Sequence, residues 1–242
     1  MKNLLILNNR RDSYSNLIWS IAIKNKWNTF RMVISDDLWD VSNGYNCVRF
    51  YGDTLTGDNL IRPPFKFYTV DSDLLEKIFV KFPEFTQRPI RSTLLGELGT
   101  LKEDLFVKPA GCKFFTAKVY QAGETVGNEH CKPDDKIYVQ GIIKPINEIR
   151  CFVLNGKVLT ASYYRKDGEF NPEFIEEVPK QVKDQVAKIC KAFNIPWGIV
   201  LDFAQIEGYD GWIFLEANEA WASGLYDCDP NECFKVIIES QY

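Results

Sequence analysis

The chain has 242 residues, 45% of them hydrophobic and 14% aromatic, so it can bury one large core or two modest ones. A net charge of −4 without a long basic run argues against nucleic acid as the main partner. No apolar run approaches the ~20 residues that span a bilayer, no signal peptide is recognisable, and the seven cysteines form no CxxC pair, which together predict a cytosolic protein with reduced thiols and no membrane insertion.

The first hundred residues predict a small α/β domain. Apolar runs at 3–8 and 30–34 flank a helical pattern around Ile18 and Ile21, which indicates a βαβ unit. Further strands are expected at 47–51 and 65–70. A helix should follow, capped by Asp71 or Ser72 and running through Phe79, and then a short helix from Arg88 to about Leu98. A domain boundary is placed near residue 100, dividing the chain into 1–100 and 101–242.

The second part reads mainly as strands. Residues 105–120 predict two strands joined by a reversal at 109–111, and three more strands are expected at 137–143, 148–154 and 157–165. Asn155-Gly156 between the last two is a strong hairpin signal. From Pro179 to Phe193, apolar residues recur every three or four positions, which predicts an amphipathic helix.

The stretch from Trp197 to Tyr226 predicts a hairpin that carries acids at matched heights. Its strands span 198–206 and 212–218, and a turn centred on Tyr209 would place Asp202 opposite Glu216, with Asn218 one pleat further on the same face. Two carboxylates on an apolar face repel each other unless a cation lies between them. Two carboxylates and an amide oxygen suit Mg²⁺. The alternative is an edge hairpin with solvated acids.

Cations fall at informative places in this half. Glu148 and Arg150 share a face of one strand, and Arg165 ends the strand that returns beside it. By spacing alone, a plain cross-strand ion network explains these three residues. His130 is the only histidine, which excludes a multi-histidine zinc site, and we expect it to be an ordinary loop residue.

The order VKP, VQGII, EIRCFVLNGKV with a following arginine, LDF and LEAN resembles the ATP-grasp superfamily over about residues 101–230. EIRCFVLNGKVLTASYYR looks especially like carboxylate-amine ligases that modify protein or peptide carboxyl groups. The resemblance implies an α+β ATP-grasp fold, in which two antiparallel sheets enclose the nucleotide, preceded by the small α/β domain.

The resemblance also implies roles for residues at matching positions. Lys108 matches the lysine that reaches the α- and β-phosphates, and Tyr138, Val139 and Gln140 match the segment whose backbone reads adenine. Glu148 matches the acid that holds the ribose hydroxyls. Arg150 and Arg165 match the catalytic cations that neutralise the γ-phosphate, and Asp202, Glu216 and Asn218 match the Mg²⁺ ligands.

Two departures from the superfamily pattern stand out. AGCKFFTAK replaces the usual glycine-rich loop, so Lys113 and the backbone of 114–116 would have to cover the phosphates and assist catalysis. The lysine that usually precedes this domain is not obvious, and Arg88 or Arg91 is a candidate replacement. Both features resemble a compact clade of small ATP-grasp proteins, many of them phage-encoded.

An acceptor pocket is expected after the metal-binding asparagine. Its candidate residues are Arg10, Arg11, Tyr14, Trp221, Ser223, Gly224 and Tyr226. An equally good interpretation places Trp221 and Tyr226 in the core.

The function that these residues favour is ATP- and Mg²⁺-dependent ligation of a carboxylate to an amine, through an acyl phosphate, with release of ADP and phosphate. The alternatives are a nucleotide-binding protein without ligase activity and a ligase that uses a thiol or hydroxyl acceptor.

Overall fold

The computed structural model describes residues 2–8, 12–32, 41–54, 56, 66–110, 115–126 and 131–242. Its first sheet is parallel, with the order β2-β1-β3. The strands are β1 (Asn3–Leu7), β2 (Asn28–Arg31) and β3 (Cys47–Tyr51). Helix α1 (Ser13–Lys24) connects β1 to β2, which confirms the predicted βαβ unit. The helix begins where Asp12 accepts a hydrogen bond from the Ser15 N–H at 2.7 Å.

The second sheet is antiparallel, with the order β4-β7-β5-β6. Its strands are β4 (Ile90–Leu94), β5 (Leu105–Pro109), β6 (Lys118–Tyr120) and β7 (Lys136–Gln140). The helix predicted from Arg88 to Leu98 is therefore wrong. Residues 90–94 pair along the whole of β7, and a 3₁₀ helix, η3 (Leu95–Thr100), follows. The partner strand lies more than forty residues away in the sequence, so local periodicity did not reveal it.

Two further local predictions are corrected. The strand expected at 65–70 is absent from the described residues 66–70, where Phe67 makes one isolated bridge to Gln241. Helix α4 (Leu74–Lys81) has Asp73 at its N-cap position rather than Asp71 or Ser72. Another 3₁₀ helix, η2 (Pro83–Phe85), follows it.

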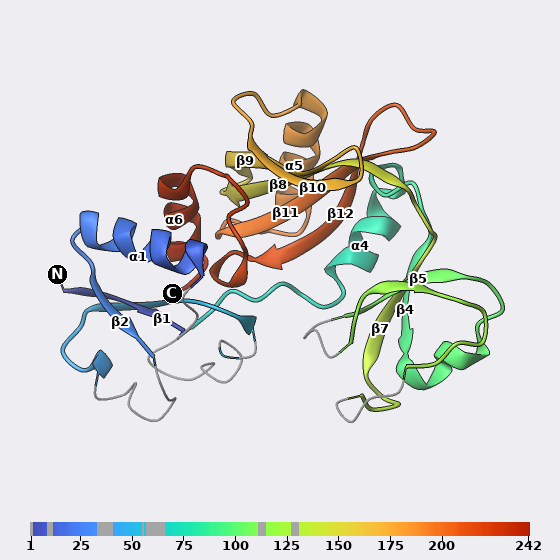
Figure 1. Ribbon diagram of the computed structural model, residues 1–242, viewed down its shortest axis with the longest axis horizontal. Helices are drawn as coiled ribbons and strands as arrows, with labels where there is room; N and C mark the ends of the chain where they lie inside the picture. The colour runs from blue at the N-terminus through green and yellow to red at the C-terminus, as the bar shows by residue number, and fades with distance from the viewer. Residues whose placement is uncertain are drawn as a thin grey trace. The chain divides into compact units, whose positions relative to one another are not determined.

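The third sheet has five strands in the order β10-β9-β8-β11-β12. These are β8 (Pro145–Leu154), β9 (Lys157–Lys166), β10 (Glu169–Phe174), β11 (Ile199–Ile206) and β12 (Trp212–Glu219). The hairpins β8-β9 and β11-β12 lie where the sequence predicts them, whereas β10 was missed. Figure 1 shows this sheet in yellow to orange.

Helices pack on the sheet elements through apolar faces. Helix α5 (Lys180–Ala192) confirms the amphipathic helix, with Pro179 at its N-cap. Helix α6 (Pro230–Ile238) was not predicted; Asp229 caps it and Pro230 opens it. A short 3₁₀ helix, η4 (Ala220–Ala222), precedes α6. None of the helices in the described part of the chain has the length and apolar character that crossing a membrane requires.

The chain forms two compact units. One comprises Met1–Val70, Asn147–Phe203 and Glu216–Tyr242, and the other comprises Asp71–Ile146 and Ala204–Leu215. In the first unit, one core joins Leu5 of β1, Ile18 of α1, Phe152 of β8 and Phe234 of α6. Helices α1 and α6, from opposite ends of the chain, accordingly lie side by side (Figure 1). The domain boundary near residue 100 was placed between the α/β pattern of the first part and the strand-rich second part of the sequence. It stays a prediction.

Gly198 shows how closely α6 approaches the start of β11. Its N–H donates to Glu239 O at 3.1 Å, and a Cβ at this position would lie 1.9 Å from the backbone oxygen of Val236. A side chain of any size therefore forces the strand and the helix apart.

We predict that Gly198→Ala lowers the free energy of unfolding by about 2–3 kcal/mol, because overpacking against backbone cannot relax by a rotamer change. Gly168→Ala is the matched control. It adds a Cβ with nothing within 4 Å and costs only the strain of its φ of +80°, about 1–2 kcal/mol. Urea unfolding of both variants measures the difference, and a smaller loss for Gly198→Ala than for Gly168→Ala would contradict the packing argument.

Candidate functional site

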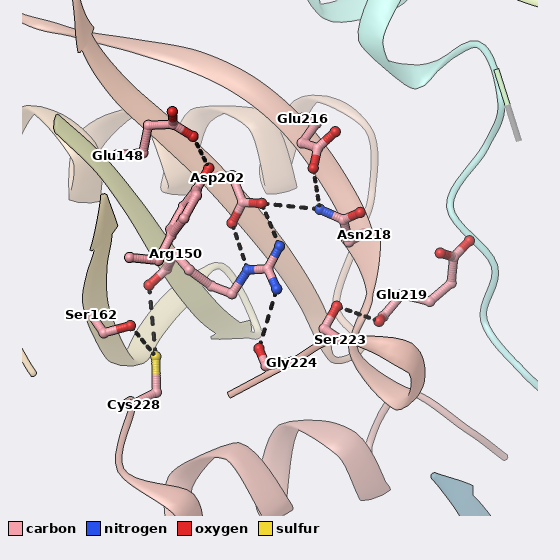
Figure 2. A network of polar contacts seen from close by, with 11 residues as sticks. Glu148, Arg150, Ser162, Asp202, Glu216, Asn218, Glu219, Ser223, Gly224 and Cys228 are labelled. Atoms are coloured by element: carbon pink, nitrogen blue, oxygen red, sulfur yellow. Dashed lines mark hydrogen bonds and ion pairs between the residues drawn. The ribbon is translucent and has the colours of Figure 1, made fainter. Parts of the chain in front are cut away.

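Three oxygen-bearing side chains meet on neighbouring strands of the five-stranded sheet. Asp202 lies on β11, and Glu216 and Asn218 lie on β12. The Asn218 Nδ2 donates to Asp202 Oδ2 and to Glu216 Oε1, each at 3.1 Å (Figure 2). A connection of five residues joins the two strands, which is too short for a parallel crossover, so they run antiparallel. The hairpin thus brings together the three residues predicted as metal ligands.

Arg150 binds the central carboxylate of this group. Its Nε donates to Asp202 Oδ1 at 2.9 Å and its Nη2 to Asp202 Oδ2 at 2.7 Å, a bidentate ion pair. Its Nη1 donates to Gly224 O at 3.2 Å (Figure 2). The exposed fraction is 0% for Asp202 and 7% for Arg150, so the pair is shielded from water. The sequence interpretation that joined Arg150 to Glu148 is therefore wrong for Arg150, whose carboxylate partner is on β11.

The electrostatics of the pair follow from burial. Burial raises the pKa of the Asp202 carboxyl, Arg150 opposes this, and the carboxylates of Glu216 and Glu148 raise it further. Burial alone would lower the pKa of Arg150, but the charge of Asp202 outweighs that effect and raises it. Three carboxylates thus lie close enough to repel one another, and one of them, Asp202, is fully buried. An additional cation would lower the free energy of this arrangement.

Two β-bulges decide which residues meet on β8 and β9. The pairing register shifts once at Phe152/Val153 and again at Glu148/Ile149. A plain continuation of the register at the Asn155-Gly156 turn would place Arg165 opposite Ile146, whereas the two shifts place Arg165 opposite Glu148. The Arg165 Nε lies 3.0 Å from Glu148 Oε1, which confirms the Glu148–Arg165 half of the expected ion network.

The second bulge also brings in a residue that sequence reasoning missed. Tyr164 stands between the residues paired with Ile149 and Glu148, and its hydroxyl donates to Glu148 Oε2. The sequence offers only the run Ser162-Tyr163-Tyr164-Arg165, in which nothing distinguishes the second tyrosine from the first.

The residues expected in an acceptor pocket divide between core and site. Trp221 is 1% exposed and packs against Phe50 and Phe67, so the core interpretation holds for it. Tyr226 instead lies over Arg150, with the guanidinium carbon 4.4 Å from its ring centroid, and meets Tyr14 edge to face. The remaining candidates are Ser223, whose hydroxyl donates to Glu219 O, Gly224, which binds Arg150, and Arg10 and Arg11, which lie outside the described residues.

The donor set at the hairpin fits a hard cation. Among the described residues, no group of three or more His, Cys, Asp or Glu side chains is arranged for a metal ion. The set here comprises two carboxylates and an amide, and Mg²⁺ commonly takes few protein ligands of this kind. The Asn218 amide faces the carboxylates with its nitrogen. Turned by half a rotation, it presents its oxygen to the same place.

Comparison with known proteins identifies the family. A family model described as "ATP-grasp domain, R2K clade family 2" matches residues 85–236, more than half of the chain. The chain belongs to this ATP-grasp family. A search of curated proteins finds no match.

Solved structures agree with the ATP-grasp fold and confirm the predicted fold class. D-alanine–D-alanine ligase from Bacillus anthracis, complexed with ATP, is 18% identical with a TM-score of 0.59, over 99% of this chain and 97% of that one. A RimK domain protein ATP-grasp from Sphaerobacter thermophilus is 9% identical with a TM-score of 0.60, over 98% of each chain. A Chryseobacterium gregarium RiPP-associated ATP-grasp ligase, in complex with ADP and a leader and core peptide, is 12% identical with a TM-score of 0.52, over 98% and 96%.

Other ATP-grasp positions named from the sequence lie in the second compact unit. Lys108 on β5 pairs with Tyr138 on β7, and Val139 and Gln140 end that strand. The Tyr138 hydroxyl donates to Ser72 O. Lys113 lies outside the described residues. The nucleotide-binding roles of these residues stay predictions.

Arg88, one candidate for the missing ATP-grasp lysine, has a structural role, because its guanidinium holds two strands together. It is 6% exposed, and its guanidinium donates to Gln140 Oε1 at 3.0 Å, Phe214 O at 3.0 Å and Leu215 O at 3.2 Å. These bonds tie β12 to the end of β7. Arg91 is exposed on β4, opposite Val139, and it remains the candidate.

We predict that Arg150→Met lowers the free energy of unfolding by about 3–5 kcal/mol, because it leaves the buried Asp202 carboxylate without its counter-charge. Arg165→Met is the matched control. The Arg165 side chain is 42% exposed and that of Glu148 13%, so water reaches this pair more than the Arg150 pair and its loss costs less, about 1 kcal/mol. Urea unfolding measures both. Equal losses in the two variants would show that burial of the Arg150 pair is not what matters.

Proposed function

We propose that the protein is an ATP- and Mg²⁺-dependent ligase that joins a carboxylate to an amine through an acyl phosphate. The observation that carries the proposal is the convergence of Asp202, Glu216 and Asn218 beside Arg150. Phosphoryl transfer needs positioning and charge neutralisation rather than a covalent nucleophile, and these residue types supply both. Membership of the ATP-grasp family supports ATP as the phosphoryl donor.

The reaction has two bond exchanges. A carboxylate oxygen of the substrate attacks the γ-phosphorus of ATP, the bond from that phosphorus to the β,γ-bridging oxygen breaks, and ADP leaves. The amine then attacks the acyl carbon, the carbon–oxygen bond to phosphate breaks, and phosphate leaves as the nitrogen loses a proton to solvent. The acid is a small metabolite or the carboxyl group of a peptide or protein. A similar fold that binds a leader and core peptide supports the second class.

Asp202, Glu216 and Asn218 would hold the Mg²⁺. When bound, the ion supplies charge neutralisation at the phosphoryl oxygens and fixes their orientation. Arg150 holds Asp202 in place through two hydrogen bonds, so the protein positions this ligand before any cation arrives. Glu148 binds the ribose hydroxyls. Arg165, held by Glu148, would neutralise phosphate charge, and the same role is proposed for Lys108 and Lys113.

We expect the wild-type protein, given ATP, Mg²⁺ and a panel of carboxylates, to release ADP and to form hydroxamate when hydroxylamine replaces the amine. Asp202→Asn should lower the rate at least about a thousandfold, because a cation ligand and the partner of Arg150 are lost together. Asp184→Asn is the matched control, since Asp184 is exposed on α5 and pairs only with Lys180 among the ion pairs described. ATP binding without ADP release above the Asp202→Asn level, across a broad panel, would favour a binding protein without ligase activity.

Magnesium should also stabilise the fold without any substrate. Binding to the native state alone raises the free energy of unfolding by about 2.7 kcal/mol at 100 times the dissociation constant. We expect MgCl₂ to raise the melting temperature relative to NaCl of equal ionic strength, and Glu216→Gln to remove this shift. Glu173→Gln, which alters an exposed glutamate paired with Lys166, should keep it. A shift that survives Glu216→Gln unchanged would place the cation elsewhere.

A further inference from the structure

Two tyrosines, Tyr164 and Tyr226, contact two charged side chains of the proposed site, Glu148 and Arg150. Tyr164 donates its hydroxyl to Glu148, and its ring stacks on that of Tyr226 with centroids 5.3 Å apart. The Arg150 guanidinium carbon lies 4.4 Å from the Tyr226 ring centroid and 5.7 Å from that of Tyr164. A guanidinium over aromatic faces gains a cation–π attraction and loses freedom to turn. The rings therefore restrict the rotation of the Arg150 guanidinium.

The backbone aims both rings by unusual local structure. Tyr164 is the extra residue of the β-bulge at Glu148/Ile149, and bulges redirect side chains that a regular strand would place elsewhere. This bulge lets Tyr164 and Arg165 both reach Glu148. Tyr226 is also placed by a local departure from regular backbone. Two independent departures therefore orient the two rings.

Tyr226 and Asp227 both have left-handed backbone, with φ of 48° and 69°. Consecutive non-glycine residues in this region carry strain that the surroundings must hold. The loop is fixed on both sides of Tyr226. Gly224 O accepts from Arg150 Nη1 before it, and Cys228 Sγ lies 3.3 Å from Ser162 Oγ after it, as Figure 2 shows.

We infer that Tyr164 is a positioning residue that sets the proposed ribose-binding acid Glu148 and, with Tyr226, the cation Arg150. The inference rests on the proposed function, because it assigns Tyr164 to the nucleotide end of that site. Through its hydroxyl the residue fixes one carboxylate oxygen of Glu148. Through its ring it supports the Tyr226 ring that covers Arg150. One side chain thereby couples ribose recognition to the geometry of the Arg150–Asp202 pair.

The test compares dissociation constants for ATP and for 2′,3′-dideoxy-ATP, which lacks the hydroxyls that Glu148 would hold. The wild type should bind ATP about tenfold more tightly, the contribution of hydrogen bonds to a charged group. Tyr164→Phe keeps the ring and loses the hydroxyl, and it should reduce this preference to about twofold. Tyr163→Phe makes the same change on the neighbouring residue, whose ring lies 5.3 Å from Lys166 Nζ, and it should keep the preference.

A second measurement separates positioning from general damage. Adding Tyr164→Phe to Glu148→Gln should cause little further loss of ATP over dideoxy-ATP preference, since the hydroxyl acts through Glu148. Tyr226→Leu should lower the turnover number about tenfold, and Tyr226→Phe, which retains the ring, should restore it.

Each outcome decides the inference. Full preference for ATP in Tyr164→Phe, or additive losses in the double variant, would overturn it and leave the proposed function intact. Wild-type binding of ATP without any preference over dideoxy-ATP would overturn the role of Glu148 and the inference with it. A failure of the wild type to bind ATP at all would instead defeat the proposed function itself.

Discussion

The buried ion pair between Arg150 and Asp202 is the interaction on which the rest of the site depends. Asp202 lies among other carboxylates, where burial and repulsion both raise its pKa, and only a close cation offsets the cost of placing it there. Arg150 does so with two hydrogen bonds and uses a third to hold Gly224, while the Tyr226 ring covers it. One guanidinium therefore organises the acid on β11 and the loop that follows β12. Removing the arginine would disturb both together.

The fold was predictable where local patterns and tertiary structure agree. The Asn155-Gly156 turn, the amphipathic face of α5 and the β11-β12 hairpin are all specified by short stretches of sequence. The segment 90–94 was not predictable in this way. Residues 90–94 form a strand because β7 provides a partner. Arg88, just before this strand, donates to carbonyl oxygens more than 120 residues away. Such non-local hydrogen bonds override the secondary-structure propensity of a segment, and no periodic pattern in its sequence reveals them.

The candidate site was predictable by residue type and order, and less so by partnership. The sequence brought Asp202, Glu216 and Asn218 together because strand alternation has a fixed period. It gave Arg150 the wrong carboxylate because the true partner, Asp202, lies on β11, on the other side of β8. It overlooked Tyr164 because the pairing of β8 with β9 contains two bulges. Each bulge shifts the register by one residue, and a shift of one changes every partner beyond it. Local strand composition does not encode where such a shift occurs.

The charge balance of the site bears on how a cation and a nucleotide would bind. Glu148, Asp202 and Glu216 bring three negative charges, and Arg150 and Arg165 bring two positive ones. A sum of −1 attracts a divalent ion only modestly, since the guanidinium groups already neutralise most of the charge. Adding the ion changes the sum to +1, and a triphosphate then meets a site of opposite sign. By linkage, each ligand must strengthen the binding of the other by the same factor. The arginines thus keep a buried acidic site folded while leaving full charge compensation to the ion and the nucleotide together.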